Sequence, residues 1–257
     1  MKKSYILVID SGLGGVSVLK ILKDKFPQES FIFLADNGIS PYGNKTKKVL
    51  KTHILKVLNS YILKFSIKLI IFACNTLTAS TINFVRKNIK INVIGTEPPI
   101  KQVKNNKKTL VLATNGTIKY SKLLKKYKNN NQFIFVPLKD IASLLDKNYF
   151  NRDEILKSLK KQIPKQKFKN VVLGCTHYYF LKLEIAKILY GKVKFYDAIN
   201  GIVKRVKSII PKSLVFSKQT IKIFVTKKNV NLKKTIKYIL NKQTSKSKNH
   251  IIFKNIA

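Results

Sequence analysis

The sequence predicts an α/β protein made of two pseudo-symmetric α/β domains with mostly parallel sheets and an active site at their interface. Three observations support this prediction. Strand-like and helix-like runs alternate along the chain, the alternation restarts near residue 109, and each half carries a cysteine at the end of a strand-like run. Alternation of this kind is typical of parallel α/β sheets. The length of 257 residues and a hydrophobic fraction of 45% allow one large or two small domains with a real core.

Short apolar runs predict the strands of the first half, and apolar residues at helical spacing predict its helices. The expected strands cover residues 5–9, 31–35, 68–73 and 92–95, and the expected helices cover 16–25, 47–65 and 78–87. The longest of these helices has an apolar stripe formed by Val49, Leu50, Ile54, Val57, Leu58, Tyr61 and Ile62. This half therefore begins as a series of βα units.

The second half repeats the pattern and suggests an internal duplication. Its expected strands cover 109–113, 132–136 and 171–174, and its helices cover 119–127, the region 141–163 and 201–210. A polar residue stands at the end of the first strand in each half, Asp10 in the first and Thr114 in the second. A cysteine stands at the end of a later strand in each half, Cys74 in the first and Cys175 in the second. We place the domain boundary near Pro98, because consecutive prolines break regular structure. The prediction is a discontinuous first domain, 1–97 with 209–257, and a second domain, 98–208.

The tail is expected to contribute a strand at 221–225, a helix at 232–240 and a strand at 251–253 to the first domain. The lysine-rich stretch 241–249 between the last two is expected to be a solvated loop.

The net charge of +41 raises the possibility of a nucleic-acid partner. Only three of the 52 basic residues are arginine, the usual reader of bases and phosphates, and the lysines are spread over the whole chain. We therefore interpret the lysines as solvated faces and expect nucleic-acid binding to be weak and driven by charge alone.

The apolar runs are too short for a membrane partner, since a spanning helix needs about 18 apolar residues or more. The start at Met1 resembles an export signal, but its apolar stretch stops at Asp10. We expect a cytoplasmic protein with free thiols.

The two cysteines are the strongest candidates for chemistry. A cysteine at a strand-to-helix turn lies near helix amides that favour the thiolate, although a lone cysteine there is more often a small buried hydrophobe. His177, two residues after Cys175, could exchange a proton with it, or could be a hydrogen-bonded turn histidine. Two cysteines and one such histidine are too few for a structural zinc site, so no metal is expected.

The loop from Asp10 to Gly15 does not match a nucleotide-binding motif. It lacks the third glycine of a dinucleotide loop and the lysine of a P-loop. Its amides could hold a carboxylate at the start of the next helix. Asp10 could alternatively cap that helix.

Six segments in order make the chain resemble the glutamate racemases of the cofactor-independent amino-acid racemase superfamily. They are Asp10-Ser-Gly-Leu-Gly-Gly15, Pro41-Tyr-Gly43, Ala73-Cys-Asn-Thr76, Gly95-Thr-Glu-Pro98, Ala113-Thr-Asn-Gly-Thr117 and Leu173-Gly-Cys-Thr-His177. The resemblance covers about residues 4–210, and the tail matches more loosely.

The resemblance implies interconversion of L- and D-glutamate without pyridoxal phosphate or metal, supplying D-glutamate for peptidoglycan. Cys74 would deprotonate D-glutamate with help from Asp10, and Cys175 would deprotonate L-glutamate with help from His177. The implied substrate-binding residues are Asp10, Ser11, Tyr42, Gly43, Asn75, Thr76, Thr117, Thr176 and His177. The family often forms homodimers, so a homodimer is possible here.

Some positions depart from the family pattern. Many members carry a glutamate after a Pro-Leu segment as an aid to the second cysteine, and here Asp140 is the expected counterpart. Tyr179 stands where a proline is frequent, and Leu77 where small residues are common. Two alternatives stay open: a racemase of aspartate or another acidic amino acid, and a basic protein that interacts with nucleic acid or gyrase.

Overall fold

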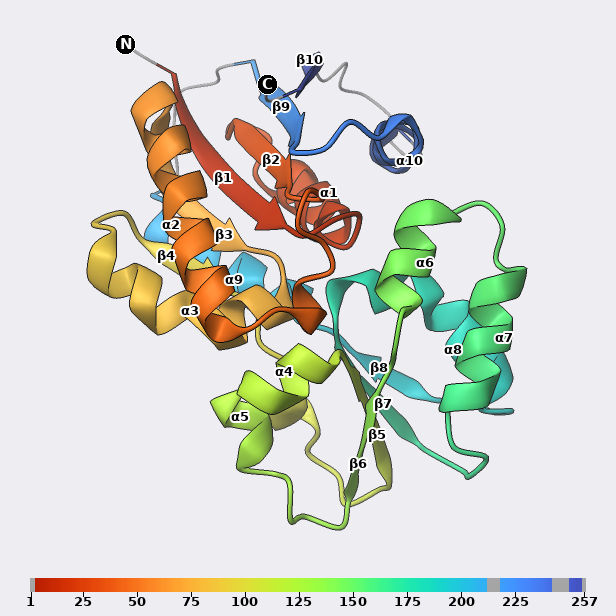
Figure 1. The fold of residues 1–257 in the computed structure, drawn as a ribbon. Coiled ribbons are helices and arrows are strands. Elements are labelled where there is room, and N and C mark those ends of the chain that lie inside the picture. The colour runs from red at the N-terminus through yellow and green to blue at the C-terminus, as the bar shows by residue number, and fades with distance from the viewer. Residues whose placement is uncertain (1–2, 212–217, 242–249, 256–257) are drawn as a thin grey trace.

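The structure is a computed structural model that describes residues 3–211, 218–241 and 250–255 (Figure 1). It contains two sheets in which every strand pairing is parallel. The first sheet has the order β10-β9-β2-β1-β3-β4 and the second has the order β6-β5-β7-β8. The predicted α/β class with two parallel sheets is confirmed.

The strands follow the predicted ranges closely. In the first sheet they are β1 Ser4–Asp10, β2 Phe31–Ala35, β3 Ser66–Phe72, β4 Val93–Gly95, β9 Thr220–Val225 and β10 His250–Asn255. In the second sheet they are β5 Thr109–Ala113, β6 Phe133–Pro137, β7 Asn170–Gly174 and β8 Lys194–Tyr196. The short edge strand β8 is the one that the apolar pattern did not predict. The expected loop at 241–249 lies outside the described residues except for its first position.

The strand order supports the internal repeat. The order β2-β1-β3-β4 in the first sheet is the same as β6-β5-β7-β8 in the second, counted along each half. Strands β9 and β10 extend the first sheet beyond this shared core. Because the connections are equivalent, the carboxyl ends of β1, β3, β5 and β7 occupy corresponding places in the two halves.

The helices connect successive strands. They are α1 Gly15–Lys25, α2 Lys47–Lys64, α3 Asn75–Asn88, α4 Asn115–Tyr120, α5 Lys122–Lys125, α6 Ile141–Lys147, α7 Asp153–Gln162, α8 Lys182–Ile188, α9 Ile199–Ile209 and α10 Val230–Asn241, with short 3-10 turns η1 Tyr42–Asn44, η2 Ile100–Gln102 and η3 Thr176–Leu181.

The expected single helix at 119–127 is wrong: α4 ends at Tyr120 and α5 starts at Lys122. The Ser121 hydroxyl between them accepts a hydrogen bond from the Leu124 amide and so begins a new helix.

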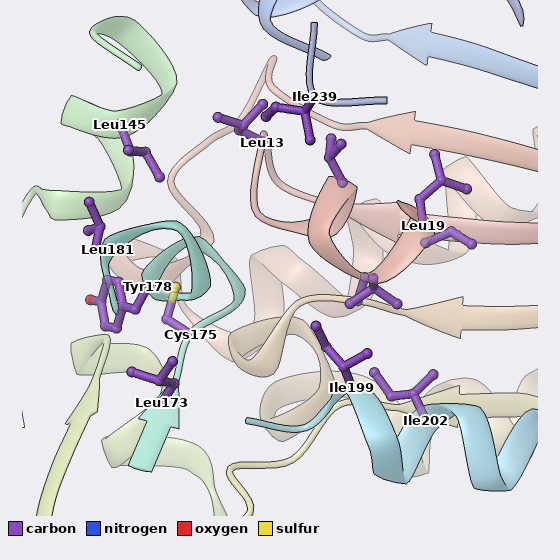
Figure 2. Packing of buried hydrophobic residues seen from close by; sticks show 14 of the residues in the cluster. Leu13, Leu19, Leu145, Leu173, Cys175, Tyr178, Leu181, Ile199, Ile202 and Ile239 are labelled. Atoms are coloured by element: carbon purple, nitrogen blue, oxygen red, sulfur yellow. The ribbon is translucent and has the colours of Figure 1, made fainter. Parts of the chain in front are cut away.

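One apolar cluster runs through both halves of the molecule. It includes Leu19 of α1 and Ile202 of α9 on one side, and Leu145 of α6 and Tyr178 of η3 on the other, with Cys175 between them (Figure 2). The two halves are therefore joined by buried apolar surface, the main favourable contribution to folding.

The domain boundaries stay a proposal. Helix α9, which we assigned to the second domain, contacts α1 and β4 of the first sheet. None of the helices in the described part of the chain combines the length and apolarity needed to cross a membrane.

Candidate active site

The carboxyl ends of the two sheets face each other. Asp10 ends β1, Cys74 follows β3, and Cys175 follows β7 directly. The Thr176 hydroxyl, next to Cys175, donates a hydrogen bond of 3.0 Å across the interface to Oδ2 of Asp10. Ligands of open α/β sheets bind outside the carboxyl ends of the strands. The interface between these two edges is therefore the candidate active site.

Cys74 is a buried thiol at the first turn of α3. It occupies the N-cap position of α3, where the backbone amides of Thr76 and Leu77 favour the thiolate. Burial raises the pKa of Cys74 well above its usual value, the nearby Asp10 raises it further, and the two amides oppose the rise. Cys175 also acts on this thiol electrostatically. The two sulfur groups, which are both free and buried, thus belong to one site.

Asp10 is a completely buried carboxylate beside Cys74. Its Oδ1 accepts a hydrogen bond of 2.9 Å from the Gly12 amide, and its Oδ2 accepts the one from Thr176. Burial raises the pKa of Asp10 to about 6, while His177 and these hydrogen bonds limit the rise. The alternative helix-capping role is not what the structure shows, because Gly14 holds the N-cap of α1.

Cys175 has a different partner. His177 Nδ1 lies 3.7 Å from the Cys175 sulfur, and its Nε2 lies 3.0 Å from Oδ1 of Asp146. Burial alone would lower the pKa of His177, but the charge and hydrogen bond of Asp146 outweigh burial and hold this pKa well above its ordinary value. The imidazole is therefore favoured in its charged form, which donates one N–H to Asp146 and presents the other to the sulfur.

Asp146, the carboxylate that contacts His177, was not identified from the sequence. Asp140, which the sequence suggested for this role, does not lie next to His177. Asp140 is exposed and occupies the N-cap of α6 with φ 59° and no side-chain capping bond. Aspartate tolerates this left-handed conformation better than most residues do. One and a half turns later, Asp146 faces the interface. No motif marks this position, since a single acid in an amphipathic helix usually faces solvent.

The glycines before α1 let the chain pass close to these groups. The Gly14 amide lies 3.2 Å from Nε2 of His177, and the Leu13 amide donates 2.8 Å to Oδ1 of Asp146. A Cβ atom on Gly14 would lie 2.5 Å from the Thr176 hydroxyl and from the imidazole, which is closer than real Cβ contacts. The loop thus fits against the second half only because side chains are absent there.

Three threonine hydroxyls meet on the other side of the interface. The Thr76 hydroxyl of α3 lies 2.7 Å from that of Thr114 and 3.1 Å from that of Thr117, which lie at the start of α4. A Cβ on Gly43 would meet Thr114 at 3.1 Å, so η1 also approaches this group. Thr114 is a site residue that the sequence did not predict, although it ends the repeat-equivalent strand.

Tyr42 is buried next to this group, but its hydroxyl is engaged elsewhere. It donates to Oδ2 of Asp36, which also contacts Nε2 of His53. Burial opposes ionisation of Asp36, and the hydrogen bonds from His53 and Tyr42 outweigh it, so that its pKa is lowered. This arrangement fixes Tyr42 and leaves the η1 backbone as the part that can contact a ligand.

The remaining predicted residues are also at the interface. Ser11 and Asn75 are buried, and the Asn75 side chain donates to the Thr96 carbonyl. A cavity of about 10 Å³ adjoins Asn75, Cys175 and Thr176, which is about the space of one water molecule. The interface is therefore closely packed beside Cys175 in this conformation. Within the described residues, no group of three or more potential metal ligands is found.

Several known proteins with similar sequences and structures are named glutamate racemase. No protein-family model matches the chain. The glutamate racemase of Clostridium novyi is 35% identical over 236 residues, which cover 86% of this chain and 91% of that one. The fold is that of a glutamate racemase isoform from Bacillus anthracis, with a TM-score of 0.82, 23% identity, and coverage of 100% and 98% of the two chains.

The structure of a glutamate racemase from Francisella tularensis, in complex with D-glutamate, is similar with a TM-score of 0.79, 23% identity, and coverage of 100% and 98%. The sequence identity to the Clostridium protein extends over most of both chains. The chain therefore belongs to the glutamate racemases, which are isomerases acting on an amino acid.

Proposed function

We propose that the protein interconverts L- and D-glutamate by a two-base mechanism in which Cys74 and Cys175 act on opposite faces of Cα. One observation carries this proposal. Two buried thiols come from equivalent strand ends of the two halves, and each has its own acid–base neighbour. A symmetric pair of proton-transfer groups on either side of one interface is the arrangement that inversion at carbon requires.

In the direction from L- to D-glutamate, the Cys175 thiolate removes the α-proton and becomes a thiol. The electron pair stays on Cα, delocalised into the α-carboxylate, and the Cys74 thiol then donates its proton to the opposite face. Cys74 is left as a thiolate, and the protons return to their starting places by exchange with solvent between turnovers. The reverse reaction uses the same groups in exchanged roles.

The neighbours of the two thiols support these roles. The charged His177, held by Asp146, stabilises a Cys175 thiolate. Asp10 lies beside Cys74 with a pKa of about 6 and can accept a proton from it near neutral pH. The proposal thus assigns catalysis to Cys74, Cys175, Asp10 and His177.

The α-proton of an amino acid is very weakly acidic, so that the carbanion needs hydrogen-bond donors around its carboxylate and exclusion of water. We assign substrate binding to the hydroxyls, amides and backbone that line the interface, at Ser11, Tyr42, Gly43, Asn75, Thr76, Thr117 and Thr176. The close packing beside Cys175 supports exclusion of water from that thiol.

The D-glutamate complex of the Francisella protein favours glutamate as the substrate. Aspartate remains the alternative, because it differs by one methylene and such a difference is worth only about 10–200-fold in a pocket. In a cell the product would be used for peptidoglycan.

The test is racemisation of L-glutamate by the purified protein, followed by circular dichroism, without added cofactor and in the presence of a chelator. Cys74→Ser and Cys175→Ser should each lower turnover by at least about 10³-fold, since serine is a far weaker base at neutral pH. L-Aspartate assayed in parallel should be turned over more slowly. Full activity of either cysteine variant would contradict the mechanism, and faster turnover of aspartate would change the substrate.

A further inference from the structure

A second hollow lies on the outer face of the second half, away from the cysteines. It is lined by residues at the C-terminal ends of α7 and α8 and has a volume of about 890 Å³. These two helices lie at the right-hand edge of the molecule in Figure 1. None of its lining residues is among those at the candidate active site. Its size is that of pockets which enclose drug-sized groups or several side chains.

The floor of the hollow is apolar. Leu156 and Lys160 of α7 and Ile163 at its C-cap follow one another at helical spacing, so that this face of the helix forms a wall. The loop after α7 and the end of α8 complete the lining with Pro164, Gln166, Ile188 and Leu189. Leu156 and Ile188 are only partly buried, which leaves apolar surface open to a partner.

Tyr190 stands beside this floor and is 94% exposed. Its backbone is in the left-handed region, with φ 48°, where a tyrosine is strained. A large aromatic ring that is nearly fully exposed next to an open apolar recess is a typical anchor for protein recognition.

Five lysines surround the floor, and the lining contains no acidic residue. They are Lys160, Lys161, Lys165, Lys167 and Lys187, and among the described residues none of them forms an ion pair. Lys160, Lys161 and Lys187 lie in the last turns of their helices, where the helix dipole favours cations. That effect does not explain Lys165 and Lys167, which lie in the loop.

We propose that this hollow binds an acidic peptide segment of a partner protein, whose apolar side chains fill the recess while its carboxylates pair with the five lysines. Charge complementarity requires a partner segment with a net negative charge. A second copy of this chain has few carboxylates to pair with the five lysines, because the chain has 11 acidic residues against 52 basic ones. The floor favours peptide over nucleic acid, since its aliphatic side chains offer base edges almost no hydrogen bonds, and over a membrane, since a flat surface does not fill a recess.

Lysines occur over the whole chain, so the experiment must separate this hollow from general charge. The probe is a fluorescein-labelled synthetic 12-residue peptide with glutamates on one helical face and leucine or phenylalanine on the other. Its matched control has serine at every apolar position and the same charge. Binding of the full chain is measured by fluorescence anisotropy at 150 mM salt, and we expect the amphipathic peptide to bind at least tenfold more tightly than the serine peptide.

Two pairs of variants locate the binding. Lys160→Gln, Lys165→Gln and Lys167→Gln together should weaken the amphipathic peptide at least tenfold. The same three-charge change at exposed lysines of the first half, Lys56→Gln, Lys87→Gln and Lys90→Gln, should weaken it less than threefold. Tyr190→Asn, which suits the left-handed backbone, should weaken only the amphipathic peptide, by about fivefold. Leu63→Asn, at an equally exposed apolar position, should have no effect.

Equal weakening by the two triple variants would mean that the peptide binds through the general charge of the chain, and would overturn the proposal. So would equal affinities for the two peptides, or no effect of Tyr190→Asn. The same variants are tested against vesicles of anionic phospholipid and against single-stranded DNA. If the variants of the hollow lose binding to vesicles or DNA but keep binding to the peptide, the ligand of the hollow is the lipid or the DNA, and the proposal of a peptide is wrong. Circular dichroism and thermal unfolding of each variant show that the fold is intact.

Discussion

Asp10 and His177 are both buried beside a cysteine, and the pKa of each is raised. The rise favours the uncharged form of Asp10 but the charged form of His177. At Asp10, burial outweighs the opposing effects of His177 and of the hydrogen bonds from Gly12 and Thr176, and raises the pKa of the carboxyl to about 6. His177 has the carboxylate of Asp146, which overcomes burial and favours the charged imidazole. In the proposed mechanism, Cys74 therefore works beside a base and Cys175 beside a cation. Such a difference assigns separate acid and base roles to two similar groups.

The first prediction concerns Asp146. Asp146→Asn removes the charge that keeps His177 protonated, and turnover should fall by about 10-fold or more, with the basic limb of the pH profile of kcat/KM for L-glutamate moving to lower pH. Asp140→Asn is the matched control, because Asp140 is exposed and has no contact with His177, and its kinetics should be unchanged. Loss of activity in Asp140→Asn with normal activity in Asp146→Asn would restore the assignment made from sequence.

The second prediction concerns the pH dependence of Asp10. If its carboxylate accepts the proton of Cys74, kcat/KM for D-glutamate should fall as the pH is lowered through about 6. Asp10→Asn should lower activity and remove that limb. A profile in which the acid limb lies below pH 5, or persists unchanged in Asp10→Asn, would contradict the role of Asp10.

The same carboxylate should lower the stability of the fold. Its folded pKa of about 6 lies above the ordinary value of 3.8, so the folded state holds the proton more tightly than the unfolded state does. Stability therefore decreases as the pH rises from about 4 to about 6, by up to about 3 kcal/mol. In urea unfolding, Asp10→Asn should be more stable than the wild type at pH 8 and similar to it at pH 4. Equal stability of the two proteins at pH 8 would show that burial of the Asp10 carboxylate does not destabilise the folded state.

At the scale of elements, the strand–loop–helix unit of each half positions the chemistry. The strand ends place Asp10, Cys74, Thr114 and Cys175 at one interface, and the glycine-rich loop after β1 brings backbone amides onto the second half. The third prediction tests this loop. Gly14→Ala should lower kcat at least about 10-fold, because its Cβ would collide with Thr176 and with the imidazole of His177.

The control for this variant is Gly201→Ala in α9. Nothing lies within 4 Å of a Cβ built at Gly201, and alanine is the better helix former, so that this change should raise stability by about 0.5–1 kcal/mol and leave turnover unchanged. Activity assays and thermal unfolding of both variants make the comparison. Wild-type turnover in Gly14→Ala would show that the close approach of the loop is not needed.

The sequence allowed the elements with strong apolar patterns to be predicted. It did not allow prediction of features that depend on contacts between distant parts of the chain. The alternation of apolar runs predicted every long strand and helix, and the repeat of cysteine strand ends predicted the facing arrangement. The carboxylate partner of His177 could not be predicted, because the position of Asp146 depends on how α6 docks on the loop at Leu13. The break at Ser121 was missed for a similar reason, since a single capping serine outweighed a continuous apolar stripe.

At the scale of the whole molecule, two properties set its behaviour. The halves share a buried apolar cluster across the interface, which holds them together (Figure 2). The net charge of +41 produces a positive field that attracts anions such as glutamate and raises association rates.

The fourth prediction follows from the charge. Binding to double-stranded DNA should be independent of base sequence and should weaken by at least about 10-fold between 50 and 200 mM salt, because lysine–phosphate contacts release counterions. Electrophoretic mobility shifts with two unrelated duplexes of equal length measure this. A tenfold preference for one duplex at 200 mM salt would indicate a real nucleic-acid site instead of general charge.

The central claim is that two different thiols act on the two faces of Cα, and isotope exchange in heavy water tests it most directly. L-Glutamate is incubated with the enzyme in deuterated buffer, and both enantiomers are analysed by mass spectrometry at low conversion. The two-base mechanism predicts that the D-glutamate formed carries one deuterium at Cα, while the L-glutamate that remains is still protiated. Deuterium appearing equally in the remaining L-glutamate, or D-glutamate formed with its original hydrogen, would contradict it.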